Sequence, residues 1–160
     1  MSTAGAPRPA GDFGEWLLGM QAALHGEQDS QVPCDGCTAC CTSSQFVHVE
    51  PTDEAALAVI PRELLFPAPG LPEGHWVMGY DQDGCCPMLV DGRCSIYSSR
   101  PRTCRTYDCR LFAALGRVND ATPLIAQRIR SWEFTYEDDE TRHLADEVRA
   151  SGELPPRSTG

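Results

Sequence analysis

At 160 residues the chain is long enough for one domain with a hydrophobic core, and no length remains for a second domain of ordinary size. Its formal net charge of -10 comes from 23 acidic residues against 13 basic ones, and every basic residue is an arginine. This charge argues against general nucleic-acid binding, where cations that neutralise phosphates supply much of the affinity. The apolar runs are too short to span a membrane, and the N-terminus lacks the pattern of a secretory signal. We therefore expect a cytoplasmic protein with no membrane contact.

Nine cysteines dominate the composition. Disulfides seldom persist in a reducing cytosol, where a dense cysteine pattern more often indicates a metal site or catalysis. Metal ions are therefore the partners that this sequence predicts, and it does not identify a protein partner.

The first predicted element is a helix within residues 12–28. Asp12 is a suitable N-cap, and helical spacing places an apolar stripe on one face. The stripe consists of Phe13, Trp16, Leu17, Met20 and Leu24. Residues 1–11 and 151–160 are rich in small residues and proline, so we expect two disordered ends.

The middle of the chain predicts short strands, a helix and a hairpin. After a cysteine-rich loop, "QFVHVE" and "HWVMGY" have the composition of short strands, and "PTDEAALAVIPRELL" predicts a helix that ends or kinks at Pro61. "CPMLVDGRCSIY" contains two apolar runs joined by Asp91-Gly92, which is typical of a tight hairpin.

Three more helices are expected in the last third of the chain. "SSRPRTCRTYDCRLFAALG" has a possible cap at Ser99 and a stop at Gly116, and "TPLIAQRIRSWEFTY" and "DDETRHLADEVRAS" follow it. The predicted fold class is α+β: a small single domain over residues 12–150, with several helices, short strands and a hairpin around a cysteine-ligated metal cluster.

The cysteines form two groups separated by 43 residues, at positions 34–41 and 85–109. "CDGCTACC" contains two successive C-x2-C steps, a spacing that brings two thiolates onto one zinc ion or iron-sulfur cluster. A bacterial ferredoxin run would continue with x3-C-P, whereas here Cys41 directly follows Cys40. The simple ferredoxin pattern therefore fails at its fourth ligand.

Two spacings predict more than one metal atom. The side chains of the adjacent Cys40 and Cys41 should diverge, which favours two ions or two atoms of one cluster. Cys104 and Cys109 would lie about 140° apart around a regular helix and about 7.5 Å apart along it. Two sulfurs on one zinc should be only about 3.7 Å apart. Either a helix starts between these two cysteines, or they bind different metals.

Five of the thirteen arginines accompany the second cysteine group: Arg93, Arg100, Arg102, Arg105 and Arg110. Nearby cations favour thiolates, which are the species that bind metal. The alternative is that these arginines face solvent or pair with surface acids.

The combination of "CDGCTACC" with "CPMLVDGRCSIYSSRPRTCRTYDC" resembles the YkgJ-type cysteine-cluster family, also described as the CxxCxxCC zinc- or iron-chelating domain. The resemblance covers about residues 34–110. It implies zinc or iron as the cofactor, with an iron-sulfur cluster as one form. It also implies eight metal ligands: Cys34, Cys37, Cys40, Cys41, Cys86, Cys94, Cys104 and Cys109. Cys85 stands outside the family pattern.

Several alternatives stay open. A similar cluster in bacterial lysine N-methylases that act on flagellin suggests an iron-sulfur-dependent protein-modifying enzyme, although this chain shows no methyl-donor motif. A thiol redox protein would use Cys85-Cys86 or a C-x2-C pair, and a metal storage or delivery protein would need an exposed site. His48 and His75 are possible metal ligands, but histidines beside strands are more often packed or solvated. No catalytic residue is predicted.

Overall fold

Residues 6–30, 32, 37–118 and 122–157 are described by the structure, which is a computed structural model. Within these residues the chain has six α-helices and short strands in three small sheets, which confirms the predicted α+β class. Its contacts divide it into two compact units. We call Met1–Pro33 with Asp108–Gly160 the helical unit, and Cys34–Tyr107 the cysteine unit. The extent of the single domain predicted over residues 12–150 stays a prediction.

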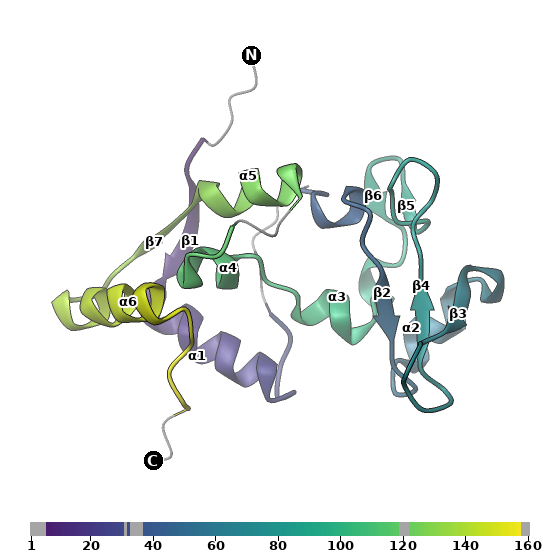
Figure 1. Ribbon diagram of the computed structural model, residues 1–160, viewed down its shortest axis with the longest axis horizontal. Coiled ribbons are helices and arrows are strands. Elements are labelled where there is room, and N and C mark those ends of the chain that lie inside the picture. The colour runs from purple at the N-terminus through teal and green to yellow at the C-terminus, as the bar shows by residue number, and fades with distance from the viewer. Residues whose placement is uncertain (1–5, 31, 33–36, 119–121, 158–160) are drawn as a thin grey trace. The chain divides into compact units, whose positions relative to one another are not determined.

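The helical unit joins both ends of the chain through a parallel pair of strands (Figure 1). Its elements are β1 (Arg8–Asp12), α1 (Phe13–Leu24), α4 (Arg110–Leu115), α5 (Pro123–Ser131), β7 (Trp132–Thr135) and α6 (Asp139–Ser151). The expectation of a disordered N-terminus is wrong for the residues in β1, because their backbone pairs with β7. The helix predicted over 122–136 is also too long, because Trp132 and Phe134 belong to β7.

The first helix, α1, has the predicted N-cap and most of the predicted buried stripe. Asp12 is its N-cap, and the side chain accepts a hydrogen bond from the Glu15 backbone N–H. The predicted stripe is buried from Phe13 to Met20 and packs with Ala114, Ala145 and Val148. Leu24 is the exception, because 55% of it is exposed at the end of the helix.

The C-terminal segment adds to this core. Leu154 packs against it, and Gln21 Nε2 donates a hydrogen bond to the Pro155 carbonyl at 3.0 Å. The disordered end expected at 151–160 is thus not seen in Leu154 and Pro155. Residues 158–160 lie outside the described residues.

The helix predicted after Ser99 is broken in two. α3 (Arg102–Thr106) and α4 are separate, and Pro101, not Ser99, is the N-cap of α3. Asp108 causes the break, because its carboxylate is buried and accepts hydrogen bonds from the Arg110 backbone, the Arg110 guanidinium and the Trp16 indole. The Ser30 hydroxyl also donates a hydrogen bond to this carboxylate, at 2.7 Å. This buried carboxylate therefore organises the start of α4.

The cysteine unit contains a three-stranded antiparallel sheet and a two-stranded hairpin (Figure 1). Its elements are β2 (Val47–Val49), α2 (Glu54–Val59), β3 (Leu65–Pro67), β4 (Trp76–Met78), β5 (Leu89–Val90), β6 (Arg93–Cys94) and α3. The strand order of the larger sheet is β2-β4-β3. The two strands, the helix before Pro61 and the hairpin are confirmed, whereas β3 was not predicted.

One face of the larger sheet forms the core of the cysteine unit. Val47, Val49 and Met78 are buried there with Ile60 and Met88. Cys86 and Cys104 pack against this core as partly buried side chains.

The described part of the chain contains no helix that is both long and apolar enough to cross a membrane.

We predict that Asp108→Ala lowers the free energy of unfolding by about 3–5 kcal/mol, because it leaves the buried Arg110 charge without its carboxylate. Urea denaturation followed by tryptophan fluorescence measures this loss. Asp139→Ala is the control, since Asp139 is exposed in the first turn of α6. A loss below about 1 kcal/mol for Asp108→Ala would contradict the role assigned to this carboxylate.

Candidate metal centre

The first cysteine group ends in a tight turn. Cys40–Thr42 form one turn of 3-10 helix, and Thr42 Oγ1 donates a hydrogen bond to the Thr38 carbonyl at 2.9 Å. Because small and hydroxyl-bearing residues fill this turn, its backbone is held by local hydrogen bonds. The turn fixes where Cys40 and Cys41 lie.

Two backbone hydrogen bonds join this turn to the second cysteine group. Cys86 N–H donates to the Cys41 carbonyl at 2.7 Å, and Ser44 N–H donates to the Gly84 carbonyl at 2.9 Å. Gly84 has a φ of 78°, and a Cβ at this position would lie 2.6 Å from Ser44 Oγ. Only glycine fits so close an approach without strain. This junction was not predicted, although the glycine just before Cys85-Cys86 is a sequence signal for it.

The hairpin positions Cys94. Asp91 and Gly92 both have positive φ, as a two-residue type I′ turn requires, and Leu89 pairs with Cys94 across the strands. Leu89 N–H donates to the Cys86 carbonyl at 2.9 Å. The hairpin therefore begins just after Cys86 and brings the chain back to Cys94.

Cys104 lies on α3, which Asp53 anchors. The buried Asp53 carboxylate accepts a hydrogen bond from Arg102 N–H at the start of α3 and another from Glu50 N–H, at 2.9 and 2.8 Å. Arg105 adds a guanidinium contact at 3.5 Å. Asp53 was not predicted from the sequence, because Arg102 and Arg105 lie 49 and 52 positions away along the chain.

The shifted pKa values of four thiols from these segments, Cys40, Cys41, Cys86 and Cys104, have neighbouring thiols among their causes, and Cys94 is a fifth thiol that acts on three of them. Burial raises the pKa of Cys86, and the charges of Cys94 and Cys40 raise it further. The pKa of Cys104 rises to about 12, first because of burial and then because of the charges of three neighbouring thiolates. Five of the eight predicted ligands therefore lie near enough to one another to interact electrostatically.

Cys40 and Cys41 form a hydrogen-bonded pair. The pKa of Cys40 falls to about 7, chiefly because the Cys41 thiol hydrogen-bonds to its sulfur. The pKa of Cys41 is raised, first by the same hydrogen bond and then by burial. The two adjacent thiols thus interact with each other, and their predicted binding to two metal atoms stays a prediction.

The arginines of this region have different partners. Arg100 is the one whose positive charge lowers the pKa values of both Cys40 and Cys104. Its guanidinium lies 3.9 Å above the Tyr97 ring, and its Nη1 donates to the Cys104 carbonyl at 3.4 Å. Arg102, Arg105 and Arg110 instead lie beside the carboxylates of Glu50, Asp53 and Asp108.

The other predicted cysteines are placed differently. Cys34 lies outside the described residues, and Cys37 is half-buried. Cys109 belongs to the helical unit, where its buried sulfur accepts a hydrogen bond from the Trp132 indole at 3.0 Å. It is the N-cap of α4, whereas Cys104 lies within α3, which ends at Thr106. Cys104 and Cys109 therefore do not share one helix, but no helix starts between them, so the first predicted possibility is wrong and the binding of different metals stays a prediction.

Cys85 differs from these cysteines in its orientation. Its Sγ lies 3.9 Å from the Asp83 carbonyl, within its own turn. Among residues 6–30, 32, 37–118 and 122–157, no group of three or more His, Cys, Asp or Glu side chains is arranged so that it could hold a metal ion.

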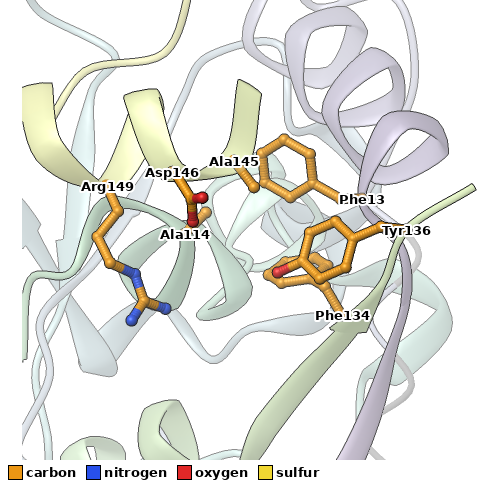
Figure 2. A pocket seen from close by; sticks show the side chains of 7 residues that line it. All are labelled: Phe13, Ala114, Phe134, Tyr136, Ala145, Asp146 and Arg149. Carbon is orange, nitrogen blue, oxygen red and sulfur yellow. The ribbon is translucent and has the colours of Figure 1, made fainter. Parts of the chain in front are cut away.

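A small cavity of about 160 Å³ lies in the helical unit. Figure 2 shows the Phe13, Phe134 and Tyr136 rings on one side of it and Arg149 on the other. Arg142 lies 4.7 Å from the Tyr136 ring centre. Because its lining contains no cysteine or histidine, this cavity has none of the soft ligands that zinc or iron prefers.

The thiols on short strands, turns and a helix define the class of this protein as a cysteine-cluster protein. A match to a family model then defines its family. Residues 33–139, more than half of the chain, match the model of the CxxCxxCC family, described as "Putative zinc- or iron-chelating domain". The chain therefore belongs to this family, as the motifs predicted. No curated protein and no solved structure is significantly similar to it.

We predict that, in the reduced metal-free protein, the alkylation rate of Cys40 rises with a midpoint near pH 7, whereas Cys104 needs a pH near 12. Thiolates are the reacting species, so a lowered pKa moves the rise to lower pH. Iodoacetamide labelling with mass spectrometry measures both profiles.

Replacing Cys41 with alanine tests the cause of this shift. It should move the Cys40 midpoint upward, because the hydrogen bond from Cys41 is lost, while Cys85→Ala should leave the midpoint unchanged. An unaltered Cys40 profile in Cys41→Ala would show that the thiol pair is not the cause.

Proposed function

We propose that this protein binds zinc or iron through thiolates of the cysteine unit, and that the site holds more than one metal atom. The observation that supports this most is the gathering of Cys40, Cys41, Cys86, Cys94 and Cys104 from a turn, a hairpin and a helix. One tetrahedral zinc ion takes four ligands, so five neighbouring thiols exceed the needs of a single ion.

The chemistry of these residues fits a thiophilic cation. Burial and mutual repulsion oppose the ionisation of Cys86 and Cys104, and both costs fall when a cation neutralises the sulfurs. Arg100 supplies one positive charge, fewer than five thiolates would need. Soft thiolates favour zinc and iron-sulfur centres over magnesium or calcium.

Bound zinc would contribute folding free energy, whereas bound iron would supply electron transfer or redox catalysis. The protein's own part is to hold the sulfurs in position through the Cys86–Cys41 backbone bond and the Asp53 anchor of α3. Cys34, Cys37 and Cys109 stay predicted ligands from the family pattern. The iron-sulfur-dependent enzyme and the thiol redox protein also stay alternatives.

The direct test is purification without oxygen, followed by an absorption spectrum and by zinc and iron counts per chain. We expect about two zinc ions in a colourless protein, or iron with acid-labile sulfide in a brown one. Either result supports metal binding, and the colour decides between the structural-zinc and iron-sulfur forms. A protein free of both metals would contradict the proposal.

Single cysteine variants then test the assignment. Cys41→Ala and Cys94→Ala should each lower the metal content, because each removes one of the gathered thiols. Cys85→Ala is the matched control, since its sulfur is directed to the carbonyl of Asp83 in its own turn. Full metal content in Cys41→Ala and Cys94→Ala would show that these sulfurs are not ligands.

A further inference from the structure

The larger sheet of the cysteine unit carries two histidines that approach each other closely. His48 Nε2 lies 3.0 Å from His75 Nδ1, and the rings are stacked with their centres 5.2 Å apart. These residues are 27 positions apart in the sequence. Neither belongs to the cysteine pattern, so their contact needs its own explanation.

Strand register brings the two rings together. His48 is opposite Val77 in the β2-β4 pair, and His75 lies two residues before Val77. Side chains two apart along a strand share a face, so all three are on the same face of the sheet. Diagonal neighbours on one face are within reach of long side chains.

The backbone of His75 is held on both sides. Its N–H donates to the Pro72 carbonyl at 3.3 Å, and its carbonyl accepts a hydrogen bond from Ala68 N–H at 3.0 Å. The second bond continues the ladder of β3 and β4 beyond the Pro67–Trp76 pair. The imidazole pair therefore stands on an ordered backbone.

This face is opposite to the one that faces the thiols. Val47, Val49 and Met78 point to the core where Cys86 and Cys104 pack, whereas the alternating His48 is only half-buried. Phe66, opposite Val77 in β3, is 40% exposed on the histidine side. The histidines are thus separated from the gathered cysteines by the thickness of the sheet.

The separation of the two nitrogens suits a shared metal ion. Imidazole nitrogens lie about 2.0–2.1 Å from zinc, so two of them at right angles around one ion are about 2.9 Å apart, and about 3.3 Å in a tetrahedral site. The observed 3.0 Å falls within this range. In the absence of metal, one ring N–H donates a hydrogen bond to the other ring.

We propose that His48 and His75 form a second metal site, a two-imidazole chelate for a divalent transition-metal ion such as Ni²⁺, Cu²⁺ or Zn²⁺, independent of the cysteines. Imidazole nitrogen is a favoured ligand of these ions. Water completes the coordination, because the half-buried rings are open to solvent.

The test uses the reduced, tag-free full-length protein carrying the zinc or iron with which it is purified. Ni²⁺ is titrated at pH 7.5 and followed by calorimetry, and Cu²⁺ is avoided because it oxidises thiols. The wild type should bind one Ni²⁺ more than His48→Gln and His75→Gln, each of which should lose that site or bind at least ten times more weakly. Equal Ni²⁺ binding by the wild type and both variants overturns the proposal.

Two further histidines provide controls. His25 contacts the Gln21 carbonyl, and His143 contacts the exposed Glu147, so each presents a single imidazole. His25→Gln and His143→Gln should keep the extra Ni²⁺ site, and its loss in either variant overturns the assignment. Since the result is a difference between histidine variants at unchanged cysteines, it holds whether or not the thiols carry metal.

A measurement on the wild type removes any dependence on how the variants fold. Diethyl pyrocarbonate modifies accessible histidines, and mass spectrometry locates each modified ring. Added Ni²⁺ should protect His48 and His75 several-fold more than His25 and His143. Equal protection of all four, or of none, would contradict a chelate at this pair.

Discussion

The cysteine unit depends on one backbone junction, the 2.7 Å hydrogen bond from Cys86 N–H to the Cys41 carbonyl. It joins two cysteine groups that are far apart in the sequence, and the Ser44–Gly84 bond beside it keeps the two segments in register. Backbone N–H and C=O groups inside a protein need hydrogen-bond partners. This hydrogen bond supplies a partner to both groups and also holds the two cysteine segments side by side. These hydrogen bonds therefore connect the first cysteine group to the second.

Gathering these sulfurs has an electrostatic cost that shapes the chemistry. Thiolate charges raise the pKa values of Cys41, Cys86 and Cys104, so these three thiols retain their protons in the metal-free unit, whereas the pKa of Cys40 is lowered. A cation that displaces these protons removes the repulsion. The family's zinc- or iron-chelating description agrees with this physical requirement.

Local signals made much of the fold predictable. The Asp12 cap, the Asp91-Gly92 turn and the stop at Gly116 act through their immediate neighbours, and all three occur where the sequence placed them. The failures came from long-range partners. β1 exists because β7 pairs with it, and the helix after Pro101 breaks because Asp108 reaches Trp16 across 92 positions.

The sequence predicted which residues make up the candidate site better than it predicted how their side chains are arranged. Cysteine spacing and the family motif gave the ligand types, but the pairing of Cys40 with Cys41 depends on a 3-10 turn that spacing alone does not reveal. The His48–His75 contact likewise follows from the β2-β4 register, which joins segments 27 positions apart. The sequence shows which residue types are present, but the distances between their side chains can be known only from the folded structure.

X-ray absorption at the edge of the metal in the purified protein tests the central claim most directly, because it measures the atoms bound to that metal. If the gathered cysteines are its ligands, the first shell consists of sulfur at about 2.3 Å. A first shell made mainly of nitrogen and oxygen at about 2.0–2.2 Å would contradict the thiolate site.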